Sequence, residues 1–162
     1  MAPNTEIRDY RPNEDVEACR RTWNESGWVD GAKNEEAFRL FVESGRSVVG
    51  VVDGSAECLV NVHPGTLRYL DEEIPLACVS GVATSRIVRR QGLAGRTTAR
   101  ALADEAHAGT LVAAIGVFDQ GFYNRLGFGN GPYETWCTFD PAQLVVGRPP
   151  RDPEAHEHDG RV

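Results

Sequence analysis

The sequence lacks any apolar run long enough to cross a membrane. A membrane-spanning helix needs about 18 or more apolar residues in succession, and no segment of the 162-residue chain approaches that length. The N-terminal segment MAPNTEIRDYRPNED also lacks the apolar stretch of a signal peptide. We therefore predict a cytoplasmic protein that has no membrane partner.

Positive charge is also in short supply. The chain has 17 Lys and Arg residues against 24 Asp and Glu residues, which gives a net charge of −7 and a pI near 5.1. Nucleic-acid binding needs a basic face, so this balance argues against a nucleic-acid partner. Cationic small molecules and basic peptides suit an acidic protein better.

Cysteine and histidine are too few and too scattered to indicate a disulfide framework or a metal site. The four cysteines form no CxxC pair, and each lies in an apolar run, which predicts buried thiols in a reducing compartment. The histidines His107, His156 and His158 have no neighbouring residues with the spacing of metal ligands. We therefore expect no metal.

The first patterned segments predict one strand followed by two helices. TEIRDY alternates as a strand, and apolar residues then recur at helical spacing over residues 14–26, with Asn13 placed as the N-cap. The same spacing over residues 34–43 predicts a second amphipathic helix.

The middle of the chain predicts an antiparallel meander. SVVGVVDG is a short apolar strand that ends in Asp-Gly, the dipeptide best suited to a tight hairpin, and AECLVNVHPG returns as its partner. Residues 66–69 and 74–82 then form a second strand pair around an acidic turn at 71–73.

The second half predicts one parallel unit. Residues 93–108 carry an apolar helical stripe that Gly109 ends, and the apolar strand TLVAAIGVF follows. With the strand ACVSGVAT before it, this helix makes a right-handed βαβ unit. Residues 120–125 form a short helix, and YETWCTFD alternates as a last strand. The predicted fold class is α/β, with a mostly antiparallel mixed sheet and one parallel βαβ unit.

We predict one folded domain over residues 1–145. A chain of 162 residues is long enough to close one hydrophobic core. After Pro141 the composition shifts to proline and charged residues, which predicts that residues 146–162 form a linker-like or disordered tail.

The segment VRRQGLAG, residues 88–95, concentrates arginine and glycine in front of the predicted helix. A helix N-terminus carries unpaired N–H groups and partial positive charge, and glycine lets an anion approach the backbone, so a diphosphate suits this place. The segment lies where ligands of parallel α/β units bind. Glycines that only permit a tight turn, with arginines facing solvent, are the alternative. The spacing matches neither a Walker loop nor GxGxxG, which disfavours nucleoside triphosphates and dinucleotides.

The loop residues 89–94, RRQGLA, resemble the R/Q-x-x-G-x-G/A signature of the GNAT superfamily of N-acetyltransferases, and they lie between a strand and a helix as in that family. The resemblance implies the acyl-CoA N-acyltransferase fold, whose sheet splays at the parallel unit to admit acetyl-CoA as cosubstrate. It also implies that the strand before the loop contacts the pantetheine arm and that the loop amides bind the pyrophosphate. Carried over by position, the cofactor-binding residues are Val82, Ala83, Thr84, Arg89, Arg90, Gln91, Gly92, Leu93, Ala94 and Gly95.

A second segment, FYNRLGF at residues 122–128, resembles the FY-x-x-x-GF segment of the same family. The resemblance implies that Tyr123 is the general acid that protonates the thiolate of departing coenzyme A. If the family resemblance is set aside, the simplest interpretation of Tyr123 is an ordinary half-buried aromatic residue whose hydroxyl is hydrogen-bonded. The presence of both motifs in this order favours the catalytic role.

Longer stretches resemble one branch of the family. Residues 65–96, GTLRYLDEEIPLACVSGVATSRIVRRQGLAGR, and the segment FYNRLGFGNGP are similar to the first domain of enhanced-intracellular-survival type N-acetyltransferases. Members of that branch continue into two further domains, so this chain is either a single-domain relative or a piece of a longer protein. Arg86 stands where the family usually has proline, either as an extra cation for coenzyme A phosphates or as a solvated side chain.

The resemblance implies an acetyl-CoA-dependent N-acetyltransferase that acts directly on a primary amine of a small cationic molecule. In the family, the strand of Val82 supplies an N–H group that polarises the thioester carbonyl. Candidates for binding or deprotonating the acceptor are Trp28, Asp30, Glu35 and His63. A turn histidine and a solvated helix start are the plainer interpretations of His63 and Glu35.

Two other functions stay open at this point. One is a catalytically silent acyl-CoA-binding or regulatory module, and the other is an acetyltransferase that acts on protein lysines or N-termini. A homo-oligomer also stays open. A serine hydrolase is disfavoured because the chain lacks G-x-S-x-G, and a cysteine nucleophile is disfavoured because no cysteine lies at a helix start beside a histidine.

Overall fold

The computed structural model describes residues 3–28, 35–116, 120–131, 136–143, 145 and 147. The chain divides into two compact units, Met1–Asn130 and Gly131–Val162. The first unit contains the sheet and its helices, and in the second the described part includes one short 3-10 helix, η3 (Pro141–Gln143). The domain boundary at residue 145 stays a prediction.

One mixed sheet organises the first unit. Its strands lie in chain order, β1-β2-β3-β4-β5. Neighbouring strands are antiparallel except β4 and β5, which are parallel. The predicted α/β class, with a mostly antiparallel sheet and one parallel pair, is thereby confirmed. The strands are β1 (Thr5–Asp9), β2 (Arg46–Val52), β3 (Ser55–Tyr69), β4 (Glu72–Thr84) and β5 (Val112–Ile115).

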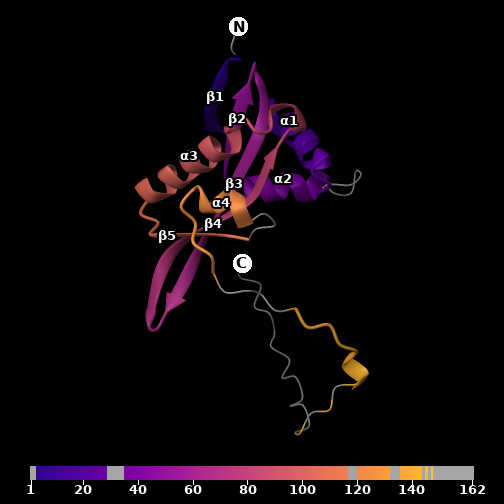
Figure 1. Ribbon diagram of the computed structural model, residues 1–162, viewed down its shortest axis with the longest axis vertical. Helices are drawn as coiled ribbons and strands as arrows, with labels where there is room; N and C mark the ends of the chain where they lie inside the picture. Colours follow the sequence, from indigo (N-terminus) through magenta and orange to yellow (C-terminus); the bar gives the residue numbers. More distant parts are fainter. Residues whose placement is uncertain are drawn as a thin grey trace. The chain divides into compact units, whose positions relative to one another are not determined.

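Helices cover both faces of this sheet (Figure 1). Alternation along the strands gives each face its own core: Val49 and Leu59 pack with Trp23 and Phe38 on one face, while the side chain of Val48 packs in a separate cluster on the other. None of the helices among the described residues is long and apolar enough to span a membrane. The helices of this unit are α1 (Pro12–Glu25), α2 (Glu35–Glu43), the 3-10 helix η2 (Arg86–Val88), α3 (Leu93–His107) and α4 (Gln120–Asn124).

The start of α1 differs from the prediction. Asn13 is not the N-cap; the helix begins at Pro12, and the backbone N–H of Arg11 donates to the Asp15 carboxylate at 2.8 Å. Proline fits the first helical position because its φ is already helical and its missing N–H has no intrahelical partner to lose. A local pattern could not show that Arg11 is the N-cap and that a carboxylate inside the helix accepts its N–H group.

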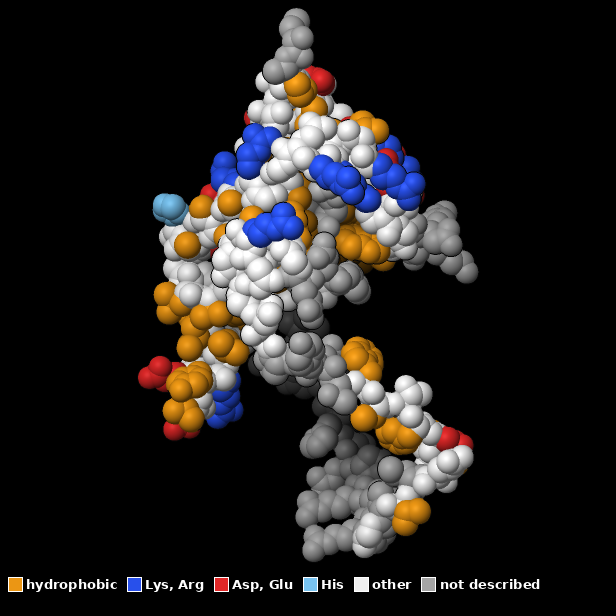
Figure 2. Space-filling view, in the orientation of Figure 1, with side chains coloured by type: hydrophobic (Ala, Val, Ile, Leu, Met, Phe, Trp, Pro, Cys, Tyr) orange, Lys and Arg blue, Asp and Glu red, His pale blue; other side chains and the backbone are white. Residues whose placement is uncertain are grey.

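Strand β3 is longer than predicted, because AECLVNVHPG and residues 66–69 form one continuous strand that includes Pro64. The pairing of β2 with β3 starts at Arg46 and Val62, so beyond that point β3 has no β2 residue beside it. A proline is tolerated there, since its missing N–H would face no strand partner. The hairpin of β3 and β4 therefore extends beyond the sheet (Figure 1), and Figure 2 shows hydrophobic and charged side chains at its end.

The predicted strand at the C-terminal end is wrong for the part that the structure describes. Residues 136–140 form no strand, and residues 132–135 lie outside the described residues. Strand β5 is also shorter than TLVAAIGVF, although residues 117–119 of that segment lie outside the described residues. Alternation predicts a strand only if a neighbour supplies ladder partners, and a sequence pattern does not show that neighbour.

The cysteines do not share one environment. Cys19 and Cys58 are buried, as predicted, and burial raises the pKa of both thiols. Cys78 is half-buried and Cys137 is exposed, so the prediction of four buried thiols is wrong for these two. An apolar sequence context does not by itself bury a residue, because burial requires a partner surface.

Two ion pairs fasten α1 to the sheet. Arg8 on β1 donates two hydrogen bonds to the buried carboxylate of Asp15, at 2.6 and 2.9 Å. Arg21 on α1 donates to the carboxylate of Glu57 on β3 at 2.6 Å, and Glu57 is only 4% exposed. Burial alone would raise the pKa of Glu57, but hydrogen bonds from neighbouring hydroxyl groups and from Arg21 outweigh it and lower that pKa.

We expect Arg8→Met to lower the free energy of unfolding by about 2–4 kcal/mol, because it leaves the Asp15 carboxylate buried without its cation. The matched control is Arg39→Met, which removes an exposed i,i+4 pair with Glu43 and should cost less than about 0.5 kcal/mol. Urea unfolding followed by circular dichroism measures both. Equal effects of the two substitutions would contradict the structural role of the buried pair.

The lowered pKa of Glu57 predicts how pH changes stability. Its contribution is fully present above the ordinary glutamate pKa of about 4.3 and is lost as the pH falls through the lower folded-state pKa. We expect Glu57→Gln to be less stable than the wild type by about 1–3 kcal/mol at neutral pH, and the difference to narrow in acid. Urea midpoints measured from neutral pH downward test this, and a constant difference would contradict it.

Candidate functional site

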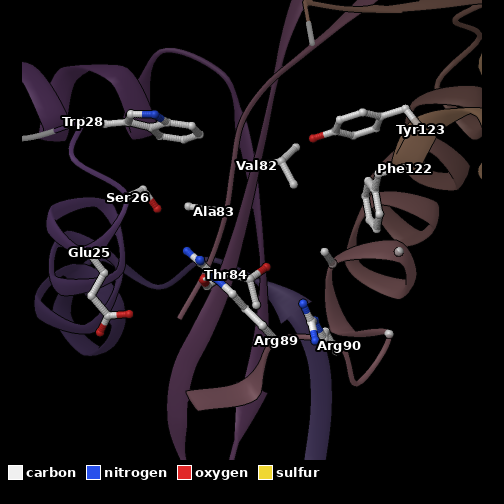
Figure 3. A pocket seen from close by; sticks show the side chains of 13 residues that line it. Glu25, Ser26, Trp28, Val82, Ala83, Thr84, Arg89, Arg90, Phe122 and Tyr123 are labelled. Atoms are coloured by element: carbon white, nitrogen blue, oxygen red, sulfur yellow. Dashed lines mark hydrogen bonds between the residues drawn. The ribbon is translucent and has the colours of Figure 1, made fainter. Parts of the chain in front are cut away.

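The first unit contains a cleft of about 600 Å³ where β4, the loop before α3, the end of α1 and α4 meet (Figure 3). A cleft of this size is ordinary for a small-molecule site. Its lining residues come from four separate segments of the sequence: Glu25, Ser26, Trp28, Val82, Ala83, Thr84, Arg89, Arg90, Gly92, Ala94, Gly95, Phe122 and Tyr123.

A β-bulge shapes the floor of this cleft. The register of β3 and β4 changes between Leu59↔Ala83 and Asn61↔Ser80, so β4 has one residue more than β3 across this interval. The extra length falls at Gly81, whose φ of +57° suits glycine, and a side-chain carbon there would come within 2.8 Å of the Phe41 and Trp23 rings. Val82 follows the bulge directly and lines the cleft.

The outer edge of β4 opens at the same place. Strand β5 pairs with β4 as far as Ile115 and Val79. Beyond that pair, from Ser80 to Thr84, the described part of the chain places no β5 residue beside β4. An extended molecule with amide groups can hydrogen-bond along such an edge in place of a strand.

The loop before α3 presents backbone N–H groups to the other half of the cleft. Gly92 caps α3 with φ +75°, and Arg90 also adopts a left-handed conformation, φ +64°. The first backbone hydrogen bond of the helix runs from the Arg96 N–H to the Gly92 carbonyl, so the N–H groups of residues 93–95 have no intrahelical acceptor. The first turn contains no acidic residue. This helix start therefore favours an anion.

The two halves of the cleft fit the parts of coenzyme A. The open β4 edge suits the amides of a pantetheine arm, and the start of α3 suits a pyrophosphate. A side-chain carbon at Gly92 would meet no atom within 4 Å, so there is space for a ligand at the cap. Arg89 and Arg90 are exposed and add positive charge, although the Nε of Arg89 also donates to the Thr84 carbonyl at 3.0 Å.

Tyr123 and Trp28 stand on opposite sides of Val82. Figure 3 shows the Tyr123 hydroxyl pointing toward Val82 from α4. The Tyr123 ring packs edge-on against Phe122 and Phe128, with centroids 4.9 and 6.0 Å away. Trp28 follows α1 and packs edge-on against Trp23 at 5.3 Å. Aromatic contacts therefore fix both side chains at the end of the cleft where Val82 lies.

The structure brings together most of the residues that the sequence singled out. Gln91 and Leu93 do not line the cleft; Gln91 is exposed, and the Leu93 side chain is buried in the core beneath the loop. Their contacts with a cofactor stay a prediction. The residues that line it are Trp28, Val82, Ala83, Thr84, Arg89, Arg90, Gly92, Ala94, Gly95 and Tyr123.

The other acceptor candidates are placed differently. Glu35 is exposed at the start of α2 and does not line the cleft, and Asp30 lies outside the described residues. The His63 ring packs against Phe41 at 5.0 Å, and its Nδ1 lies 3.4 Å from the Ser44 hydroxyl, also away from the lining. No group of three His, Cys, Asp or Glu residues in the described part could hold a metal ion, and the absence of a metal stays a prediction.

The sequence did not indicate that the end of α1 contributes residues to the cleft. Glu25 and Ser26 line the cleft, and Arg86 binds Glu25 through both its backbone and its side chain. Arg86 is thus not simply solvated. No local signal could have shown this contact, because the two residues are 61 positions apart.

We expect Gly92→Glu to abolish saturable coenzyme A binding, because it places bulk and negative charge at the start of α3. Gly109→Glu is the matched control: this glycine lies just beyond the other end of the same helix, has φ +98° and also has no atom within 4 Å of an added side-chain carbon. Titration calorimetry with acetyl-CoA measures both variants. Binding that survives in Gly92→Glu would refute the loop assignment.

Comparison with known proteins agrees with this geometry. The acetyltransferase (GNAT) domain profile matches residues 6–131. A solved aminoglycoside N-acetyltransferase AAC(6')-Iy in complex with CoA is 15% identical, with a TM-score of 0.69 over 86% of this chain and 97% of that one. No curated protein matched the chain in sequence.

Two longer solved chains share the fold. A probable N-acyltransferase from Enterococcus faecalis V583 is 17% identical with a TM-score of 0.69, and a GCN5-related N-acetyltransferase from Kribbella flavida is 18% identical with a TM-score of 0.70. They are matched over 75% and 76% of this chain, which spans 31% and 33% of their lengths. On the profile match and the fold together, the chain belongs to the GNAT family of acetyltransferase domains.

Proposed function

We propose that this protein transfers an acetyl group from acetyl-CoA to a primary amine of a small cationic molecule in the cytoplasm. One observation carries the proposal: a single cleft contains the open edge of β4, the start of α3 with no acidic residue in its first turn, and the hydroxyl of Tyr123. These are the three elements that direct acetyl transfer requires, namely a place for the cofactor arm, a place for its pyrophosphate and a proton donor.

Different segments bind different parts of acetyl-CoA. The backbone of Val82, Ala83 and Thr84 holds the pantetheine arm along the β4 edge. The N–H groups at the start of α3, with Arg89 and Arg90, neutralise the pyrophosphate. Gln91 and Leu93 take part through the loop backbone. Acetyl-CoA supplies the activated acetyl group as a thioester.

The chemistry needs no covalent enzyme intermediate. The amine nitrogen bonds to the acetyl carbonyl carbon, and the carbon–sulfur bond breaks. The N–H of Val82, which follows the bulge and lines the cleft, stabilises the negative charge that develops on the carbonyl oxygen. Tyr123 gives its proton to the departing thiolate, and the amine loses one proton to solvent or to a base on the acceptor side.

Charge and wall chemistry support a small cationic acceptor. The protein has a net charge of −7, which raises the local concentration of cations. Trp28 is 42% exposed and faces the cleft, so its ring offers a surface on which a cation can bind. Asp30, Glu35 and His63 remain proposed contacts of the acceptor. The similarity of fold to a solved aminoglycoside N-acetyltransferase is in line with an acceptor of this class.

We place the chain nearest to the first domain of enhanced-intracellular-survival type enzymes, on the segments quoted above. Mass-spectrometric assay of acetyl transfer to a polyamine, an aminoglycoside and a lysine peptide tests the function. Transfer to the peptide alone would replace the small-molecule acceptor, and cofactor binding without any transfer would favour a silent acyl-CoA-binding module.

We expect Tyr123→Phe to lower kcat by about a hundredfold or more while acetyl-CoA affinity is unchanged, because the thiolate must then leave without a proton donor. The matched control is Tyr69→Phe. Tyr69 is 63% exposed at the end of β3, where it pairs with Glu72 at the end of β4 that is distant from Val82. Steady-state kinetics and calorimetry separate the two effects. An unchanged kcat would remove Tyr123 from the mechanism.

A further inference from the structure

The end of α1 and the start of η2 hold each other through reciprocal hydrogen bonds. The backbone N–H of Arg86 donates to Glu25 Oε2 at 2.8 Å. The Arg86 guanidinium Nη2 donates to the Glu25 backbone carbonyl at 2.9 Å. Glu25 is the last residue of α1. Arg86 is the first residue of η2 and lies two positions after the end of β4. The pair therefore joins two segments that are distant in sequence.

The contact satisfies a need of the helix. The C-terminal carbonyl groups of a helix lack intrahelical partners and carry partial negative charge. The last turn of α1 contains no basic residue of its own. Arg86 supplies a cation from another part of the chain and donates a hydrogen bond to one of those carbonyls. A second link runs in parallel, because Arg21 on α1 bonds Glu57, whose carbonyl accepts the N–H of Ser85.

The residues that follow Glu25 form one wall of the cleft. Ser26 and Trp28 both line it, and their N–H groups bond back to the carbonyls of Thr22 and Trp23, each at 3.2 Å. This wall is therefore a continuation of the end of α1. The contacts that hold the end of α1 against η2 therefore also influence the distance between Trp28 and the strand of Val82, which Figure 3 shows between Trp28 and Tyr123.

We propose that Arg86 is a positioning residue. It fixes residues 26–28, the wall of the cleft that carries Trp28, relative to β4 and thereby sets the affinity for the acceptor. Its kinetic consequence rests on the proposed function, whereas its structural consequence does not. A role as a direct phosphate ligand fits less well, because the guanidinium is already bound to the Glu25 carbonyl and Arg86 does not line the cleft.

The first test measures the wall itself by hydrogen exchange. Arg86→Met removes the guanidinium but keeps the backbone N–H that binds Glu25, so the fold should survive. We expect the amides of residues 26–28 to exchange about tenfold faster, as the loss of one charge-assisted hydrogen bond implies. Arg86→Lys should restore slow exchange in part, and Arg39→Met is the control. Unchanged exchange at residues 26–28 would overturn the proposal.

The second test separates acceptor binding from cofactor binding. In Arg86→Met we expect the acceptor KM to rise about tenfold, with kcat and the calorimetric affinity for acetyl-CoA nearly unchanged. Loss of acetyl-CoA affinity without faster exchange would make Arg86 a cofactor ligand and overturn the proposal. If the wild type acetylates no amine, faster exchange in the variant still supports the positioning role, and the failure then belongs to the proposed function.

Discussion

The site depends on one constraint in strand β4, which pairs with β3 while its other edge, as far as the described residues show, has no strand partner near the cleft. Among those residues, pairing with β5 extends to Val79, and the β-bulge at Gly81 lies just beyond it. A bulge increases local twist, so it turns the backbone outward where the parallel partner is lost. Gly81 is required because the Phe41 and Trp23 rings leave no room for a side chain.

The second element of the site is a local charge that opposes the global one. The chain has a net charge of −7, yet the first turn of α3 has no acidic residue and follows Arg89 and Arg90. Interactions beyond about 10 Å are largely screened at ordinary ionic strength. The helix start can therefore favour an anion although the protein as a whole is acidic.

Tertiary contacts connect these two elements to the wall formed by α1. Arg8–Asp15 and Arg21–Glu57 fix α1 on the sheet, and Arg86–Glu25 fixes its end beside η2. Arg8–Asp15 and Arg21–Glu57 are hydrogen-bonded ion pairs with a buried carboxylate, and such pairs are costly to break. Arg86 and Glu25 are joined by two hydrogen bonds that each involve a backbone group of one partner. The end of α1 that leads to Trp28 is thus held mostly by residues that do not line the cleft, and Glu25 is the exception.

The sequence by itself determined the fold class, the two motifs and most of the order of elements as far as α4, because periodicity, turn residues and the RRQGLA and FYNRLGF segments are local properties. It could not determine that Arg11 rather than Asn13 is the N-cap of α1, that residues 55–69 form one continuous strand, or that Cys137 is exposed. The contact of Glu25 with Arg86 and the placement of His63 beside Phe41 were equally hidden. Each of these depends on which distant segment lies beside the residue, and only the folded chain brings those segments together.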